Sequence, residues 1–250
     1  MAQPRLQQIR AWLVQSFARA ALNGEQRANT RRTRLTGPRI GPATGGDPEQ
    51  LVVLLHGRGA SGADLIGLAH LLAKTLPHTV FVLPDAPRRI YETRNGLEWF
   101  TVPGPNRDPD MVEAGVRSTA PILDAFIDQE LAALGLPDNR LALLGFSQGC
   151  MMALHVGLRR TNACAAVLGY SGRLCAADNL SNEIVSRPPV FLCHGTDDWV
   201  VPFDSQMLAA TALKSVGVSV TLLERSGLGH RLDRRGIDAG AIFLARALAG

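Results

Sequence analysis

Short apolar runs alternate with longer stretches in which apolar residues recur at helical spacing, from about residue 51 to the end of the chain. The short runs are typical of buried strands, and the longer stretches are typical of amphipathic helices. This alternation predicts an α/β fold with a mostly parallel sheet and helices on both faces. The expected strands are 51–55, 79–83, 141–145, 164–169, 189–194 and 218–223, and the expected helices are 63–76, 109–134, 148–158, 202–216 and 236–248.

The length of the chain fits a single domain. It has 250 residues, of which 46% are hydrophobic, so it can bury one sizeable core. No internal repeat or long linker interrupts residues 33–250, which we predict to form this domain. Residues 1–32 differ in composition, because they are rich in arginine and contain one acidic residue, Glu25. We expect a dispensable extension there; a transit peptide or a membrane-surface helix is the alternative.

One expected strand leads directly into a G-x-S-x-G motif, and the motif leads into a helical pattern. The motif spans residues 145–149 and has Ser147 at its centre. A strand that turns into a helix this sharply holds its central residue in a strained conformation, so small neighbours are needed on both sides. The helix N-terminus also favours the negative charge that develops in acyl transfer. This context predicts that Ser147 is a nucleophile.

A nucleophilic serine needs a histidine to accept its proton and an acid to orient that histidine. In folds that carry this motif, the acid and then the histidine follow the serine along the chain. Asp197 and Asp198 follow the expected strand 189–194, at the sheet edge where open α/β sheets place their sites. His230 is the one histidine in a glycine-bracketed loop after these acids, and we predict that it is the base. Spacing alone leaves the choice between the two aspartates open.

A His-Gly-x-Gly loop follows the expected strand 51–55. A backbone N–H from such a loop and the N–H of the residue after the nucleophile form the oxyanion hole in this type of site. We assign these two donors to Arg58 and Gln148. A phosphate-binding loop is a weaker alternative, because neither G-x-G-x-x-G nor a Gly-Lys-Ser/Thr string is present there. No metal site is predicted, since the histidines and acids lack the helical spacing of a metallohydrolase.

Four separated motifs together resemble the carboxylesterase/phospholipase family of α/β-hydrolases, which includes the acyl-protein thioesterases. They are His56-Gly-Arg-Gly59, Gly145-Phe-Ser-Gln-Gly149, His194-Gly-Thr-Asp-Asp-Trp-Val-Val-Pro202 and Gly229-His230, in the family's order. The resemblance extends from about residue 33 to the end of the chain and implies an α/β-hydrolase fold. By position it implies the nucleophile Ser147, the histidine His230 and, of the two aspartates, Asp198 as the acid. It also implies substrate-binding roles for Gly57, Trp99 and Phe100, the last two lining the acyl pocket.

The residues and the resemblance together predict a serine hydrolase that cleaves carboxylic esters through an acyl-enzyme. No cofactor is expected, because the nucleophile, the base and the oxyanion donors are all protein groups. The strands are separated by few residues, with 88–108 the longest candidate for a cover, so little or no lid and short to medium acyl chains are expected. Arg58 stands where thioesterases often have an apolar residue, which favours an esterase.

Other functions stay open at this point. The enzymatic alternatives are an acyl-protein thioesterase, a lysophospholipase and a dienelactone-type hydrolase, although the last normally uses a cysteine nucleophile. The non-enzymatic alternative is a catalytically silent binding module that keeps the fold. In each enzymatic case the partner is a small-molecule ester or thioester, and the resemblance makes a homodimer an alternative to a monomer.

Charge and cysteine content refine the expected surroundings. The net charge is +4, but lysine occurs only at positions 74 and 214, and most arginines are scattered, so no nucleic-acid partner is predicted. No apolar run reaches eighteen residues, so no stable membrane insertion is expected. The four cysteines, at positions 150, 164, 175 and 193, lack paired spacing, which predicts reduced thiols and a cytoplasmic location.

Overall fold

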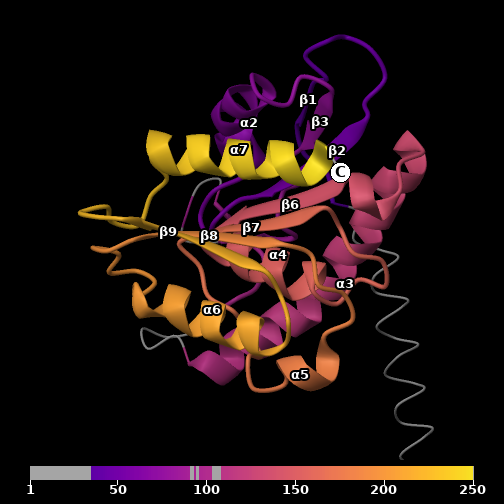
Figure 1. The fold of residues 1–250 in the computed structure, drawn as a ribbon. Helices are drawn as coiled ribbons and strands as arrows, with labels where there is room; N and C mark the ends of the chain where they lie inside the picture. Colours follow the sequence, from indigo (N-terminus) through magenta and orange to yellow (C-terminus); the bar gives the residue numbers. More distant parts are fainter. Residues whose placement is uncertain (1–34, 91–92, 94–95, 103–107, 250) are drawn as a thin grey trace, which may run out of the picture. The chain divides into compact units, whose positions relative to one another are not determined.

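A seven-stranded sheet forms the centre of the fold in the part of the chain that the structure, a computed structural model, describes: residues 35–90, 93, 96–102 and 108–249. The strand order is β1-β3-β2-β6-β7-β8-β9, and only β1 runs antiparallel to its neighbour (Figure 1). The mostly parallel sheet predicted from the hydrophobic pattern is confirmed. The strands are β1 (Arg39–Ile40), β2 (Gln50–Leu55), β3 (Thr79–Val82), β6 (Leu141–Phe146), β7 (Ala166–Tyr170), β8 (Val190–Gly195) and β9 (Val220–Arg225).

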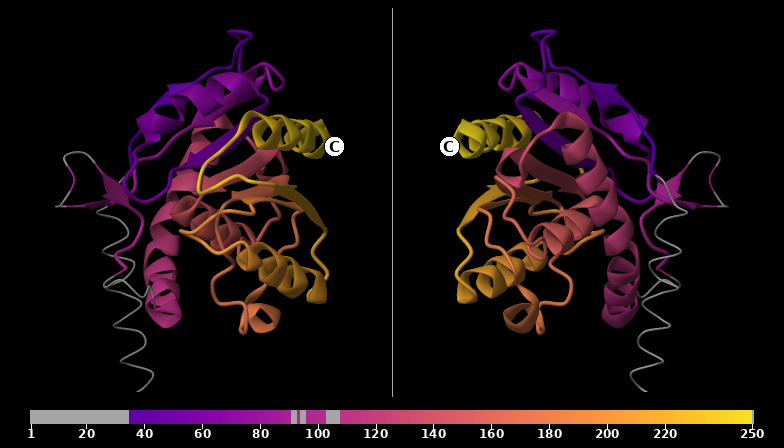
Figure 2. Two further views of the ribbon diagram at one scale, coloured as in Figure 1. Left: turned by 90° about the vertical axis from the view of Figure 1, so that its left-hand side faces the viewer. Right: turned by 90° about the vertical axis from the view of Figure 1, so that its right-hand side faces the viewer.

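Helices cover both faces of this sheet. The side views in Figure 2 show α7 (Arg234–Ala249, yellow) above the sheet, with α3 (Pro109–Leu134, magenta) and α6 (Asp204–Ser215, orange) below it. Alternate residues of β2 enter different cores: Leu51, Val53 and Leu55 pack on the side of α3 and α4, whereas Val52 and Leu54 pack on the side of α2 and α7. Burial on both faces explains why the strands read as continuous apolar runs. The helices are α2 (Ile66–Ala73), α3 (Pro109–Leu134), α4 (Gln148–Gly157), α5 (Leu180–Glu183), α6 (Asp204–Ser215) and α7 (Arg234–Ala249).

Helix α3 has the bounds that the sequence predicts, because local signals define both of its ends. The Asp108 side chain accepts a hydrogen bond from the backbone N–H of Asp110, and Pro109 occupies the first helical turn. Gly135 ends the helix in the left-handed conformation, with φ at 65°.

Several short elements were not expected from the sequence. They are β1, the hairpin of β4 (Arg88–Arg89) and β5 (Leu97–Glu98), the 3-10 turn η2 (Asp138–Arg140), and α5. The helix expected over 63–76 is divided into the 3-10 turn η1 (Gly62–Leu65) and α2, which ends at Ala73. Elements of two to four residues are too short to show a hydrophobic period, so tertiary contacts decide them.

Two expectations concern parts of the chain that the structure does not describe. The extension 1–32 lies outside the described residues, as do 91–92, 94–95 and 103–107 within the segment expected as a cover. None of the described helices is both long and apolar enough to cross a membrane.

Candidate active site

Ser147 lies in the sharp turn between β6 and α4. Its φ and ψ angles are 55° and −116°, a backbone conformation that non-glycine residues seldom adopt. The turn is tight on both sides: a Cβ on Gly145 would lie 2.1 Å from the carbonyl oxygen of Gly149, and a Cβ on Gly149 would lie 2.1 Å from that of Leu55. Only glycine fits at either position, so the two glycines of the motif allow the strained serine between them.

His230 connects Ser147 to Asp198. Its Nε2 lies 3.0 Å from Ser147 Oγ, and its Nδ1 lies 2.8 Å from Asp198 Oδ2. A carboxylate only accepts, so Nδ1 carries the proton and Nε2 is left to accept the serine hydroxyl hydrogen. The ring of Phe146 packs at a tilt against the imidazole, with 4.8 Å between the ring centroids. The imidazole is thereby oriented from two sides.

Asp198 is buried but kept ionised by its partners. Its side chain is 0% exposed, and its Oδ1 accepts hydrogen bonds of 2.9 Å from the backbone N–H groups of Val200 and Val201. Burial raises the pKa of Asp198, but the hydrogen bonds from His230 and from these two N–H groups outweigh burial and hold the pKa below its ordinary value. Asp197, in contrast, is exposed, and its side chain accepts from the hydroxyl of Thr196. Of the two aspartates, the structure brings only Asp198 to the histidine.

The His-Gly-x-Gly loop lies against the serine. A Cβ on Gly57 would lie 3.3 Å from the Cβ of Ser147, and Arg58 is the next residue. Within the described residues, neither the backbone N–H of Arg58 nor that of Gln148 donates a hydrogen bond. The loop is supported by His56, whose Nδ1 bonds the carbonyl of Gly57 at 2.8 Å while its Nε2 accepts from the N–H of Ala86 at 3.0 Å.

The side chain of Gln148 joins the start of α4 to the segment after β5. Its Oε1 accepts from the N–H of Trp99 at 3.0 Å, and its Nε2 donates to the carbonyl of Phe100 at 2.8 Å. The Trp99 indole in turn donates to the carbonyl of His56 at 2.9 Å. Trp99 and Phe100 are 0% and 1% exposed, and both side chains pack in the hydrophobic core. That they line an acyl pocket stays a prediction.

The guanidinium of Arg58 is attached to the same segment. Arg58 Nε donates to Glu98 Oε2 at 2.8 Å, and Thr101 Oγ1 donates to the other carboxylate oxygen at 2.6 Å. Glu98 is buried, whereas Arg58 is half exposed. Sequence reasoning missed this ion pair and the contacts of the Gln148 side chain, because neither β5 nor its neighbours carry a recognisable pattern.

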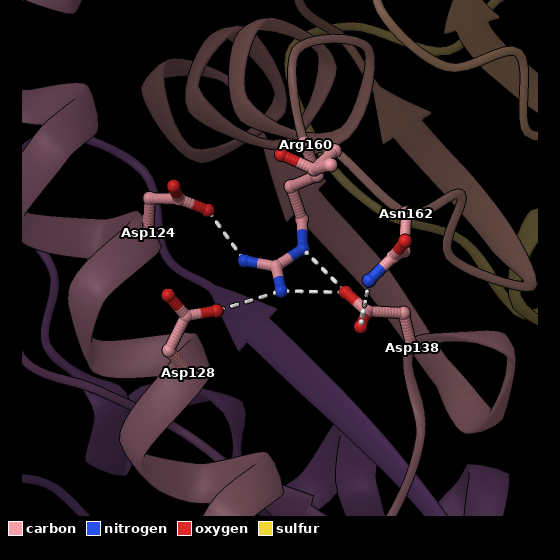
Figure 3. A pocket seen from close by; sticks show the side chains of 6 residues that line it. Asp124, Asp128, Asp138, Arg160 and Asn162 are labelled. Atoms are coloured by element: carbon pink, nitrogen blue, oxygen red, sulfur yellow. Dashed lines mark hydrogen bonds and ion pairs between the residues drawn. The ribbon is translucent and has the colours of Figure 1, made fainter.

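A second group of charged residues surrounds Arg160, beside a cavity of about 240 Å³ (Figure 3). Its guanidinium bonds Asp124, Asp128 at 2.8 Å and Asp138 at 2.6 Å. Asp138 precedes β6, whereas Ser147 follows it, so this cluster lies at the opposite end of that strand from the serine. Since Arg160 is buried and neutralised by carboxylates from α3 and η2, it ties these elements to the segment after α4.

The parallel sheet, the strained serine after β6, and the histidine and aspartate after later strands define an α/β-hydrolase. The chain belongs to the phospholipase/carboxylesterase family, whose model matches residues 42–248. The members of such a family are hydrolases that act on esters, as the name of the family states.

Individual relatives agree with this placement. The crystal structure of esterase PE8 is 39% identical in sequence, with a TM-score of 0.83, and covers 86% of this chain and 100% of its own. Acyl-protein thioesterase 1 of Emericella nidulans is 28% identical over 215 residues, which are 79% of this chain and 90% of the relative. Lysophospholipase-like protein 1 of Mus musculus is 30% identical over 210 residues, which are 80% and 87% of the two chains.

Proposed function

We propose that this protein is a serine hydrolase that cleaves carboxylic esters with short to medium acyl chains. The observation that carries the proposal is the continuous contact from Ser147 through His230 to Asp198, at 3.0 and 2.8 Å. A serine held in this geometry is activated, because the histidine can take its proton while the buried carboxylate stabilises the resulting imidazolium. Membership of the phospholipase/carboxylesterase family supports the same reaction.

In the first step, Ser147 Oγ attacks the ester carbonyl carbon as its proton moves to His230 Nε2. The negative charge that forms on the carbonyl oxygen binds to the backbone N–H groups of Arg58 and Gln148 and is favoured by the N-terminus of α4. His230 then donates its proton to the leaving alcohol oxygen, the carbon–oxygen bond breaks, and an acyl-enzyme on Ser147 remains.

In the second step, water attacks the acyl-enzyme. His230 accepts a proton from the water as its oxygen bonds to the acyl carbon, and it returns this proton to Ser147 Oγ when the carboxylic acid leaves. Asp198 stays ionised throughout and keeps the imidazole oriented with Nε2 toward the serine. The reaction uses only protein groups, so the proposal includes no cofactor.

A second candidate function is the hydrolysis of acyl-protein thioesters. The relatives from Emericella nidulans and Dictyostelium discoideum, which are 28% and 27% identical, bear the name of acyl-protein thioesterases or their homologues. The same residues can open a thioester, since the attacked group is again an acyl carbonyl. Arg58 near the carbonyl favours small esters over a long, apolar acyl chain. A homodimer and a cytoplasmic location stay predictions from the sequence.

The first test compares initial rates on p-nitrophenyl butyrate at neutral pH for the wild type, Ser147→Ala and the control Ser118→Ala. Ser118 lies on the exposed face of α3, so its replacement should not change the rate. We expect Ser147→Ala to lose at least about three orders of magnitude in kcat. Equal rates for the wild type and Ser147→Ala would overturn the proposal.

Two further measurements separate the alternatives. A fluorophosphonate probe should label Ser147 in the wild type; an unlabelled serine would favour a silent binding module. A series of p-nitrophenyl esters from acetate to palmitate should peak at short to medium chains. A peak at the longest chains, together with faster hydrolysis of palmitoyl thioesters, would favour the thioesterase.

A further inference from the structure

Arg173 differs from the other partly or fully buried arginines of the described chain. Six arginines of the described chain are partly or fully buried, and five of them donate to an oxygen. In four cases this oxygen belongs to a carboxylate. Arg140 instead donates to the carbonyl of Leu248, near the end of α7. For Arg173 the described residues supply no such oxygen. A partly buried cation without an anionic partner is costly. The four arginines paired with carboxylates are Arg117, Arg159, Arg160 and Arg225.

Arg173 lies beside the candidate nucleophile. It follows Gly172, whose Cβ would lie 3.0 Å from the carbonyl oxygen of Ser147 and 2.4 Å from Cys150 Sγ. The Cα of Arg173 is one peptide unit, about 3.8 Å, from that of Gly172. The loop after β7 is itself constrained, because Ser171 and Ala176 have φ angles of 47° and 57°. A constrained loop therefore holds Arg173 next to the turn that carries Ser147.

The groups around Arg173 do not neutralise it. Its guanidinium hydrogen-bonds the thiol of Cys175; burial raises the pKa of this thiol to about 11, and Arg173 only partly opposes the rise. The thiol is therefore uncharged at neutral pH. The charge of Glu113 also raises the pKa of the Cys175 thiol, but the Glu113 carboxylate is bonded to Arg117 at 2.7 Å.

Two other arginines follow residues that contact Ser147. Arg58 follows Gly57, and Arg231 follows His230, so each stands one residue beyond a residue that lies against Ser147. The Arg58 guanidinium forms an ion pair with the buried Glu98, and Arg231 is exposed. Three loops beside Ser147 therefore each carry an arginine, and this distribution favours a negatively charged substrate in that site.

We propose that Arg173 determines substrate specificity by binding a carboxylate carried by the ester substrate, on its acyl side, while the ester carbonyl reaches Ser147. This inference rests on the proposed function and specifies its substrate class: monoesters of dicarboxylic acids. The guanidinium suits the role, because its planar donors can form two parallel hydrogen bonds to one carboxylate. Binding of the substrate supplies the anionic partner that the protein itself does not offer.

The test compares two esters of equal acyl length and the same leaving group. These are p-nitrophenyl hexanoate, which is neutral, and mono-p-nitrophenyl adipate, which ends in a carboxylate; spontaneous hydrolysis is subtracted for both. We expect the wild type to prefer the adipate ester by about tenfold in kcat/KM at low salt, with the preference falling as NaCl rises. No preference in the wild type would overturn the proposal without the need for any variant.

Three variants assign the preference to one side chain. Arg173→Gln removes the charge, Arg173→Lys keeps it, and Arg246→Gln, at an exposed arginine near the end of α7, is the matched control. In Arg173→Gln we expect the preference to vanish through a higher KM for the adipate ester, with hydrolysis of the hexanoate ester unchanged within about twofold. Arg173→Lys should keep part of the preference and Arg246→Gln all of it. A preference that survives in Arg173→Gln would overturn the proposal.

The experiment separates this inference from the proposed function. If a fluorophosphonate labels Ser147 and the hexanoate ester is hydrolysed, but the adipate ester is not preferred, only the role of Arg173 is wrong. If the wild type is neither labelled nor active on either ester, the proposed function fails and this inference fails with it.

Discussion

His194 Nε2 lies 3.3 Å from Oδ2 of Asp198, four residues further along the chain. This is the same oxygen that accepts from His230 at 2.8 Å, so two imidazoles contact one carboxylate. His194 Nε2 also lies 3.0 Å from the carbonyl of Val201, which can only accept, so this nitrogen carries a proton and acts as a donor. The sequence motif places His194 in a strand-His-Gly turn but does not reveal this contact.

The contact predicts that His194 is a positioning residue for Asp198. In His194→Phe an aromatic ring is kept and the donor is lost, so we expect kcat to fall about tenfold with KM unchanged, because the orientation of the carboxylate affects the transition state. His194→Gln places a donor near the same point and should recover much of the activity. The measurement is kcat and KM on p-nitrophenyl butyrate. Equal losses in both variants would mean that packing, and not the hydrogen bond, sets the effect.

Gln148 is predicted to support both stability and catalysis through its side chain. Gln148→Leu leaves the N–H of Trp99 and the carbonyl of Phe100 buried without partners, at a cost of about 1–3 kcal/mol each in the free energy of unfolding. The segment that holds Arg58 through Glu98 should also shift, so kcat should fall while the backbone N–H of residue 148 remains.

Gln206 offers a matched control for this prediction. It is also a buried glutamine, and its side chain donates to the carbonyls of Leu192 and Leu223, on β8 and β9. We expect Gln206→Leu to lower stability in urea denaturation and leave kcat unchanged, whereas Gln148→Leu should lower both. Equal losses of kcat in the two variants would contradict a specific role of Gln148.

The larger elements could be predicted from the sequence because their signals are local. Helix α3 spans Pro109–Leu134 between the N-cap Asp108 and the C-cap Gly135, and residues of these types are local start and stop signals for a helix. The candidate site residues could be predicted to lie together because each follows a strand of one parallel sheet, and the carboxyl ends of such strands meet at one edge. Ser147 and His230 were therefore expected together, from positions 83 residues apart.

What the sequence does not reveal is the set of side chains that support the site. The ion pair of Arg58 with Glu98 depends on β5, a strand of two residues whose pairing is decided by tertiary contacts. The partners of the Gln148 amide are backbone groups of Trp99 and Phe100, and any sequence supplies such groups. A pattern of residue types carries no information on which backbone group comes within reach.

Substitutions at two residues beneath the serine, Gly169 and Cys150, are predicted to have coupled effects on stability. Gly169 on β7 lies opposite Gly145 on β6, and a Cβ on Gly169 would lie 2.5 Å from Cys150 Sγ. Gly169→Ala should therefore lower the free energy of unfolding by about 1–3 kcal/mol through overpacking. In the double variant Gly169→Ala/Cys150→Ala the sulfur is gone, so much of this loss should be recovered.

A double-mutant cycle in urea measures this coupling. Cys164→Ala is the control, because Cys164 is also a free, buried cysteine but does not contact Gly169. Combined with Gly169→Ala, it should give additive losses. Additive losses for Cys150→Ala as well would show that the new methyl group does not meet the sulfur.

His155 is predicted to make stability depend on pH. It is 4% exposed, its Nδ1 has no hydrogen-bond partner among the described residues, and burial, aided by the charges of Arg159 and Arg117, lowers its pKa from 6.5 to about 3. Below pH 6.5 the unfolded chain binds a proton at this residue and the folded chain does not. Stability should therefore fall as the pH drops from about 6.5 toward 3, by up to about 1.4 kcal/mol per pH unit from this residue.

His155→Met should remove this contribution, because methionine fills a similar space and does not titrate. The free energy of unfolding, measured in urea between pH 7.5 and 4.5, should decline less steeply in the variant than in the wild type. Some decline should remain, since burial also lowers the pKa of His56. Parallel curves for His155→Met and the wild type would show that His155 binds its proton equally well in the folded and unfolded chain.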